Sequence, residues 1–230
     1  MKNRALLISL VILIASAAAV AQEHKLVQFQ MAILKKGPQW SVMKLEDRNK
    51  VMLQHRDSVF ALLNSGKMVV AGPFADETDL AGIFVLRATA DEAKTLVDQD
   101  PAVKAGLMSA EMHPWYSEDI FRKPAVPLKM NGVYFGFLKK GPNRKDGDAD
   151  KPEIQELQKA HIANINRLAD LKKLVVAGPF GDEGELRGIF VFRVNSLQEA
   201  QDLAATDPMI KIDRLRIELH PWQVPEGVLP

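Results

Sequence analysis

The chain has 230 residues, of which 47% are hydrophobic and 26% charged, and its formal net charge is +1. This length and composition can bury a core in one or two globular domains. The near-neutral charge argues against nucleic acid or an anionic membrane surface as a partner and leaves small molecules as the favoured ligands. The sequence contains no cysteine, which excludes disulfides and cysteine-based sites.

The first 21 residues have the pattern of a secretory signal peptide. Lys2 and Arg4 are basic, an apolar run follows from Ala5 to Val20, and small residues occupy the cleavage positions 19 and 21. An uncleaved membrane anchor is the alternative, but the run is short for a spanning helix of about 20 residues. We therefore expect cleavage after Ala21 and a periplasmic or secreted protein with no membrane attachment.

Hydrophobic periodicity predicts a complete set of strands and helices in the first half of the mature chain. Apolar residues alternate with polar ones in the strands, recur at helical spacing in the helices, and are interrupted by Gly66 and by Gly72-Pro73. The expected elements are a strand at 25–35, a helix at 43–64, strands at 67–71 and 80–87, a helix at 90–99 and a strand at 108–113.

The second half repeats the first. The stretch from Lys67 to Arg87 returns from Lys173 to Arg193 with 15 of 21 residues identical. Such an internal repeat decides the domain organisation. The corresponding elements are expected at 133–139, 153–171, 174–177, 186–194, 196–205 and 212–220.

The order of strands and helices in each unit is β-α-β-β-α-β, which is the ferredoxin-like arrangement. A four-stranded sheet with both helices on one face leaves its other face bare, and the matching face of the second unit is the natural cover. We therefore predict an α+β fold of two tandem ferredoxin-like units packed sheet to sheet, and a monomer in solution. The expected boundaries are signal peptide 1–21, first unit 22–116, linker 117–130 and second unit 131–225.

A histidine stands at the same place in the first helix of each unit. His55 and His161 lie on the apolar stripe of their helices, so both imidazoles should face the sheet. A buried structural histidine is one interpretation. The other is a general acid or base, because an unpaired polar group on an apolar face is costly and histidine titrates near neutrality.

Asp100-Pro101 and Asp207-Pro208 follow the second helix of each unit. An aspartate can cap a following turn whose first residue is proline. Alternatively, the aspartates orient the two histidines, which would make them part of a site.

Two further patterns favour metals only weakly. Glu111 and His113 share a strand face with Trp115, as the corresponding residues do in the second unit, and carboxylate with imidazole suits zinc or copper. A strand that ends at His-Pro-Trp, with the tryptophan packed on the other unit, is the preferred interpretation. The segment 146–150 resembles the start of a calcium loop but lacks the glycine and the closing glutamate, so a solvated loop is expected.

With a helix histidine, then Ala-Gly-Pro-Phe, then Asp-Pro before a last strand, each unit resembles the YCII-related (YciI-like) family. The resemblance covers nearly all of the mature chain, twice, and implies a dimeric α+β barrel with a cleft whose histidine and aspartate are catalytic. From the apolar stripe and the paired motifs we expect the pocket of each unit between the first helix and the sheet. Members with an assigned reaction resemble chloromuconolactone dehalogenase, which performs a cofactor-free elimination. Carried over by position, the implied catalytic residues are His55, His161, Asp100, Asp207 and Asp170, and the implied pocket-lining residues are Gly72, Pro73, Gly178 and Pro179.

The two units depart from this pattern at different positions. The first has Asn64 where the second has Asp170, and the second has Asp213 where the first has Gly106. Two hypotheses follow. One is a cofactor-free lyase or isomerase acting on a small molecule, with a helix histidine as acid or base; the other is a non-catalytic binding or structural module.

Overall fold

The computed structural model describes residues 25–145 and 147–230, so the expected signal peptide lies outside the described residues. The first unit consists of β1 (Leu26–Lys36), α1 (Leu45–Ser65), β2 (Met68–Pro73), β3 (Leu80–Leu86), α2 (Ala90–Asp98), α3 (Pro101–Lys104) and β4 (Met108–Glu118). The second repeats it as β5 (Met130–Lys140), α4 (Pro152–Asp170), β6 (Leu174–Pro179), β7 (Leu186–Phe192), α5 (Leu197–Ala204), α6 (Pro208–Lys211) and β8 (Leu215–Pro225). None of these helices is long and apolar enough to cross a membrane.

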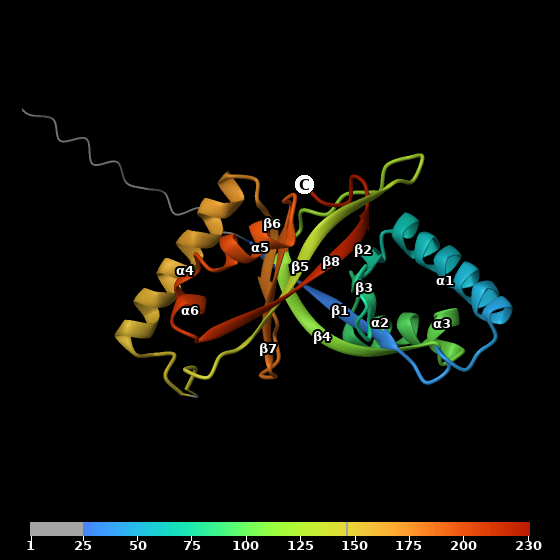
Figure 1. The fold of residues 1–230 in the computed structure, drawn as a ribbon, viewed down its shortest axis with the longest axis horizontal. Helices are drawn as coiled ribbons and strands as arrows, with labels where there is room; N and C mark the ends of the chain where they lie inside the picture. The colour runs from blue at the N-terminus through green and yellow to red at the C-terminus, as the bar shows by residue number, and fades with distance from the viewer. Residues whose placement is uncertain (1–24, 146) are drawn as a thin grey trace, which may run out of the picture.

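Each unit forms one antiparallel four-stranded sheet. The strand orders are β2-β3-β1-β4 and β6-β7-β5-β8. The two sheets face each other in the middle of the molecule, and the helices of the two units cover their opposite, outer faces (Figure 1). The prediction of tandem ferredoxin-like units packed sheet to sheet is confirmed, although the oligomeric state stays a prediction.

The largest core lies between the two sheets and is built from both units. Its fully buried members include Phe29 and Trp115 from the first unit and Phe135 and Trp222 from the second. Each unit also has its own outer core between sheet and helices. Burial of the inner sheet faces therefore depends on the association of the units.

The two units also exchange hydrogen bonds at equivalent places. The indole of Trp222 donates to the carbonyl oxygen of Gly72 at 2.9 Å, and that of Trp115 donates to Gly178 at 3.1 Å. Thus the Gly-Pro pair, which the sequence placed after a strand, ends β2 and β6 themselves, and its glycine lies against the last strand of the other unit. The expectation that the tryptophans pack on the neighbouring unit is confirmed.

The last strands do not end where the sequence suggested. β4 and β8 continue through Pro114 and Pro221 to Glu118 and Pro225. Both are edge strands, where a proline removes no necessary hydrogen bond, and the carbonyl oxygen of Pro114 accepts one from Gly181 of the other unit. The strand-terminus interpretation of His-Pro-Trp was therefore wrong.

The segment 119–129 joins the units and packs on both. Ile120 and Phe121 contact the core between the sheets. The backbone N–H of Ala125 donates to Glu226 near the C-terminus at 2.8 Å. In Figure 1 this segment passes above the C-terminal part of α1, which brings it to the first unit's helix face.

We predict that a side chain at either Gly-Pro glycine disrupts the association of the units. A Cβ atom added to Gly72 would lie 1.8 Å from the carbonyl oxygen of Gln223, and one added to Gly178 would lie 1.9 Å from that of Tyr116. Gly72→Ala should lower the free energy of unfolding in urea by roughly 1–3 kcal/mol or more, the cost of overpacking. Gly184→Ala is the control, because its Cβ would find its nearest neighbour at an ordinary 3.4 Å. Equal stability of Gly72→Ala and Gly184→Ala would contradict the prediction.

Candidate functional site

The structure brings the helix histidine of each unit onto the aspartate that follows the second helix. In the first unit, Nδ1 of His55 lies 2.8 and 2.9 Å from the two carboxylate oxygens of Asp100. The side chains are 13% and 4% exposed, and the imidazole stacks on the ring of Phe84 with centroids 5.8 Å apart. The pair is thus fixed at the interface between α1 and the sheet.

The second unit holds the same arrangement. His161 Nδ1 lies 2.6 Å from Asp207, and its ring stacks on Phe190 at 6.1 Å. Four sequence-predicted site residues therefore form two pairs. The carboxylate–imidazole hydrogen bond places the proton on Nδ1 and leaves the lone pair on Nε2.

Both aspartates also cap short helices that the sequence analysis expected only as turns. One oxygen of Asp100 accepts hydrogen bonds from the backbone N–H groups of Ala102 and Val103 at 2.9 and 3.3 Å, and Pro101 begins α3. Asp207 caps α6 in the same way. The cap and the histidine contact are thus not alternatives. One carboxylate does both.

A cavity of about 340 Å³ lies between α1 and the sheet of the first unit, and His55 is on its wall. Gly72 and Pro73 also line it, as do Met52, Val59 and other apolar side chains. Nε2 of His55 makes no hydrogen bond with any residue in the described part of the chain. An imidazole nitrogen with a free lone pair is therefore available beside a largely apolar cavity.

Parts of the chain far from the first unit complete this cavity. Leu128 precedes β5, Met130 begins it, and Pro225 ends β8. Sequence reasoning missed these residues, because only the packing of the second unit on the first brings them to α1.

The second unit has a cavity of about 390 Å³ at the equivalent place, lined by Gly178, Pro179 and Ile165. His161 is not among its lining residues. The two histidine–aspartate pairs are alike, but the spaces beside them are not.

The model of the YCII-related domain matches residues 29–115 and 139–223. The chain belongs to the YCII-related family. Both matches contain the histidine–aspartate pair and the Gly-Pro residues that end β2 or β6, and together they span most of the chain. A search of curated protein sequences finds no match.

Solved structures share the fold of the whole YCII-related chain at low sequence identity. A chlorite dismutase mutant from Candidatus Nitrospira defluvii has a TM-score of 0.58 and 12% identity, covering 88% of this chain and 92% of its own. A heme-binding protein from Thermus thermophilus has a TM-score of 0.55 and 14% identity, covering 87% and 93%. A putative monooxygenase from Lactobacillus acidophilus NCFM has a TM-score of 0.52 and 13% identity, covering 88% and 95%. These likenesses establish the dimeric α+β barrel fold.

Asp170 lies apart from both pairs. It is the exposed last residue of α4, roughly 13 Å along the helix axis from His161. The position implied by the family resemblance thus contributes to neither described histidine–aspartate pair.

The strand histidines bridge the two units. His113 Nδ1 contacts Asp182 of the second unit at 2.6 Å, and His220 Nδ1 contacts Asp76 of the first at 2.5 Å. Their Nε2 atoms lie 3.1 and 3.2 Å from the glutamates two residues earlier in the same strands. In residues 25–145 and 147–230, no cluster of three or more ligating side chains could hold a metal ion.

These glutamates are also paired with lysines. The hydrogen bond from Lys35 lowers the pKa of the Glu111 carboxyl, and that from Lys139 lowers the pKa of Glu218. Sequence reasoning missed the contacts of Asp182 and Asp76, the acidic residues after Gly-Pro-Phe, with the strand histidines. The only sequence signal for these contacts was that the acidic residues after Gly-Pro-Phe and the strand histidines each occur once in each unit.

The expectation of a solvated loop at 146–150 was wrong at Asp148; Asp146 lies outside the described residues. Asp148 is buried and accepts hydrogen bonds from the guanidinium of Arg214 at 2.6 and 2.7 Å. Arg214 stands where the first unit has Leu107, a fully buried core residue. The arginine needs a carboxylate partner at this buried position, and the loop supplies it.

We predict that this ion pair contributes to acid sensitivity. The hydrogen bonds from Arg214 lower the pKa of the folded-state Asp148 carboxyl. Its stabilisation is therefore fully present above the unfolded value of about 3.9 and is lost as the pH falls through the lower folded value. Asp148→Asn should be less stable than the native protein at pH 7 and should lose less stability below about pH 4.

Urea unfolding at a series of pH values measures this difference. The control is Asp150→Asn, which changes an exposed aspartate of the same loop. Identical pH dependence of Asp148→Asn and the native protein would show that the pair does not contribute.

Proposed function

We propose that the first unit is a cofactor-free acid–base site of the lyase or isomerase type, acting on a small organic molecule. The observation that carries this proposal is the position of His55, on the wall of an apolar cavity with Nδ1 held by Asp100 and Nε2 without a partner among the described residues. A general base needs an available lone pair, and a fixed orientation makes it effective.

In this proposal Nε2 of His55 removes a proton from a substrate carbon next to a carbonyl group. The hydrogen bond from Nδ1 to Asp100 then stabilises the imidazolium that forms. The imidazolium returns the proton either to another carbon, which is an isomerisation, or to a departing group, which is an elimination. No oxidant or reductant is needed.

The cavity indicates the class of substrate. Its volume of about 340 Å³ is at the lower end of the range for small-molecule sites. Arg56 is the only lysine, arginine, aspartate or glutamate among the described residues that line it. We infer a compact, largely apolar substrate with at most one carboxylate, which Arg56 would bind.

One structural relative is described as heme-binding, which raises the question of whether a haem fits this site. His55 has the features of an iron ligand, namely a free Nε2 and a carboxylate on Nδ1. However, a cavity of about 340 Å³ is too small for a porphyrin with its two propionates. The residues of this site do not fit a haem.

Solvent exchange of acidic C–H groups tests the proposal while the substrate is still unidentified. A panel of small ketones, lactones and keto acids is incubated with the protein in D₂O, and loss of the acidic C–H signal is followed by proton NMR. The native protein should accelerate exchange for at least one compound. His55→Ala should reduce that rate by on the order of 10²–10⁴.

His161→Ala is the matched control, because it removes an equivalent pair whose histidine does not line the corresponding cavity. His161→Ala should leave the exchange rate within about twofold of the native rate. If no compound exchanges, and both alanine variants lose several kcal/mol of stability, the histidines are structural. The chain is then a non-catalytic binding or structural module.

We also propose that the protein is exported to the periplasm or secreted, with residues 1–21 removed. The basic start, the apolar run and the small residues at 19 and 21 support this. Mass spectrometry of the purified mature protein should show Gln22 at the N-terminus. Ala21→Lys should block the cleavage, and an intact Met1 in the native protein would contradict the proposal.

A further inference from the structure

Part of the wall of the His55 cavity is built from residues outside the first unit's helix and sheet. Leu128 lies in the segment 119–129 that joins the units, and Met130 begins β5. Met130 pairs across the sheet with Pro225, the last residue of β8, which also lines the cavity. Leu128 and Met130 belong to none of the three hydrophobic cores of the described residues. Their apolar side chains therefore serve neither unit's packing, and the cavity is the place to look for their role.

Burial decreases from the histidine to the joining segment. The His55 side chain is 13% exposed, whereas Leu128 is 40% and Met130 44% exposed. The two large apolar side chains thus stand at the more open end of a largely apolar cavity. An apolar group bound against them would remove their surface from water, which is favourable by roughly 25 cal/mol per Å².

The backbone that carries these side chains is fixed to the C-terminal tail. The N–H of Ala125 donates to the carbonyl oxygen of Glu226 at 2.8 Å, and the N–H of Glu226 donates to that of Lys129 at 2.8 Å. The N–H of Arg122 donates to Val228 at 3.1 Å, and Val228 is fully buried in the core between the sheets. A ligand therefore meets Leu128 and Met130 in positions set by the second unit.

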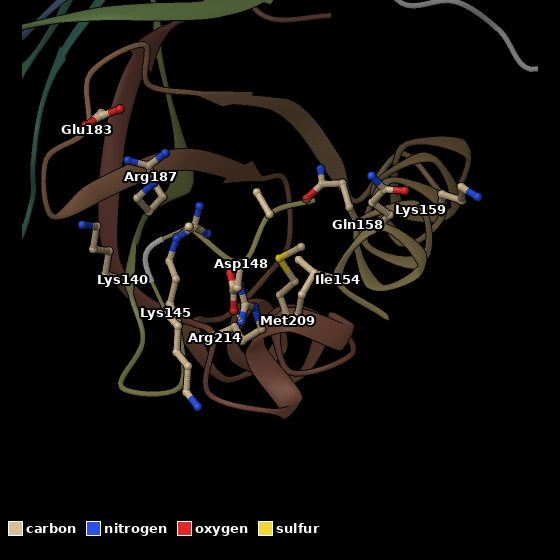
Figure 2. A pocket seen from close by; sticks show the side chains of 14 residues that line it. Lys140, Lys145, Asp148, Ile154, Gln158, Lys159, Glu183, Arg187, Met209 and Arg214 are labelled. Carbon is tan, nitrogen blue, oxygen red and sulfur yellow. Dashed lines mark hydrogen bonds and ion pairs between the residues drawn. The ribbon is translucent and has the colours of Figure 1, made fainter. Parts of the chain in front are cut away.

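The second unit does not repeat the apolar wall beside its own helix histidine. Gln158 and Arg187 stand where the first unit has Met52 and Ala81. Met52 and Ala81 line the His55 cavity. Gln158 and Arg187 line a different space, and Figure 2 shows Gln158 on α4 with Arg187 on the opposite side. Selection of an apolar ligand beside a helix histidine is therefore a property of the first unit.

We propose that Leu128 and Met130 are specificity-determining residues, which cover the apolar end of a ketone substrate that carries an extended alkyl or aryl group. The carbonyl end lies at His55, the more buried end of the cavity, and the apolar group reaches the joining segment. This inference rests on the proposed function, which places the reacting carbon at His55. It adds that the substrate is chosen by side chains from outside the first unit.

Isothermal titration calorimetry with two phenyl ketones of different chain length tests the proposal on the full chain. The native protein should bind hexanophenone more tightly than acetophenone, because only the longer ketone reaches the joining segment. Leu128→Ala and Met130→Ala should each weaken hexanophenone binding by about fivefold or more, the effect of losing apolar contact area. Acetophenone binding should change by less than about twofold. A variant that merely unfolds or distorts the cavity would weaken both ketones.

Val126→Ala is the matched control. Val126 lies in the same segment, is 95% exposed and does not line the cavity. This variant should leave the affinity for hexanophenone within about twofold of the native value, and Leu128→Met should keep most of the native affinity because it preserves the apolar contact.

The position of the bound ketone gives a second measurement. In protein labelled with ¹³C in its methionine methyl groups, hexanophenone should shift the signal of Met130 and leave that of Met209, a buried residue of α6, unchanged.

The proposal is overturned if hexanophenone does not bind, if Leu128→Ala and Met130→Ala weaken the two ketones equally or not at all, or if Val126→Ala weakens hexanophenone binding as much as Leu128→Ala. Binding requires no proton transfer, so selective binding without solvent exchange would contradict the proposed function alone. Solvent exchange that depends on His55 but not on Leu128 or Met130 would contradict only the role of these two residues.

Discussion

The close approach of the Gly-Pro end of β2 and of β6 to the last strand of the other unit is the constraint on which the rest of the structure depends. Only a residue without a Cβ leaves room for the carbonyl oxygen that lies against Gly72 or Gly178. This approach also brings the tryptophan indoles within hydrogen-bonding distance of the same two glycines. Two sheets that would each expose an apolar face are thereby joined into one core, and the C-terminal end of β8 is carried to the wall of the first unit's cavity.

Much of the fold could be predicted from the sequence, because alternation, helical spacing and the internal repeat are local signals. The course of β4 through Pro114 could not, since it depends on the strand being at a sheet edge with a partner from the other unit. The sequence also could not show that the backbone at Asp213 keeps the left-handed conformation of Gly106, the equivalent residue of the first unit. Gly106 has φ of 69° and Asp213 has φ of 55°. A loss of glycine in the sequence did not change the backbone, because aspartate tolerates this conformation better than most residues.

The candidate site could be predicted only in part from the sequence. The pairing of His55 with Asp100 joins residues on different elements, and it was proposed because both occur twice in the same order. The segment containing Leu128 and Met130 carries no such signal, since its place on the cavity wall follows from how the units pack. Arg214 is the opposite case. Its charge at a core position signals a buried partner, but only the structure identifies that partner as Asp148.

The histidine–aspartate pair alone does not distinguish a catalytic unit from a structural one. Asp100 and Asp207 cap α3 and α6, so each carboxylate has a role in folding whether or not its histidine reacts. What differs between the units lies beyond the imidazole, where Met52 and Ala81 leave an apolar space and the second unit places Gln158 and Arg187. A duplicated fold held together by its interface can keep the pair in both halves while these lining positions diverge. The functional information of the chain is therefore concentrated in the residues that the two halves do not share.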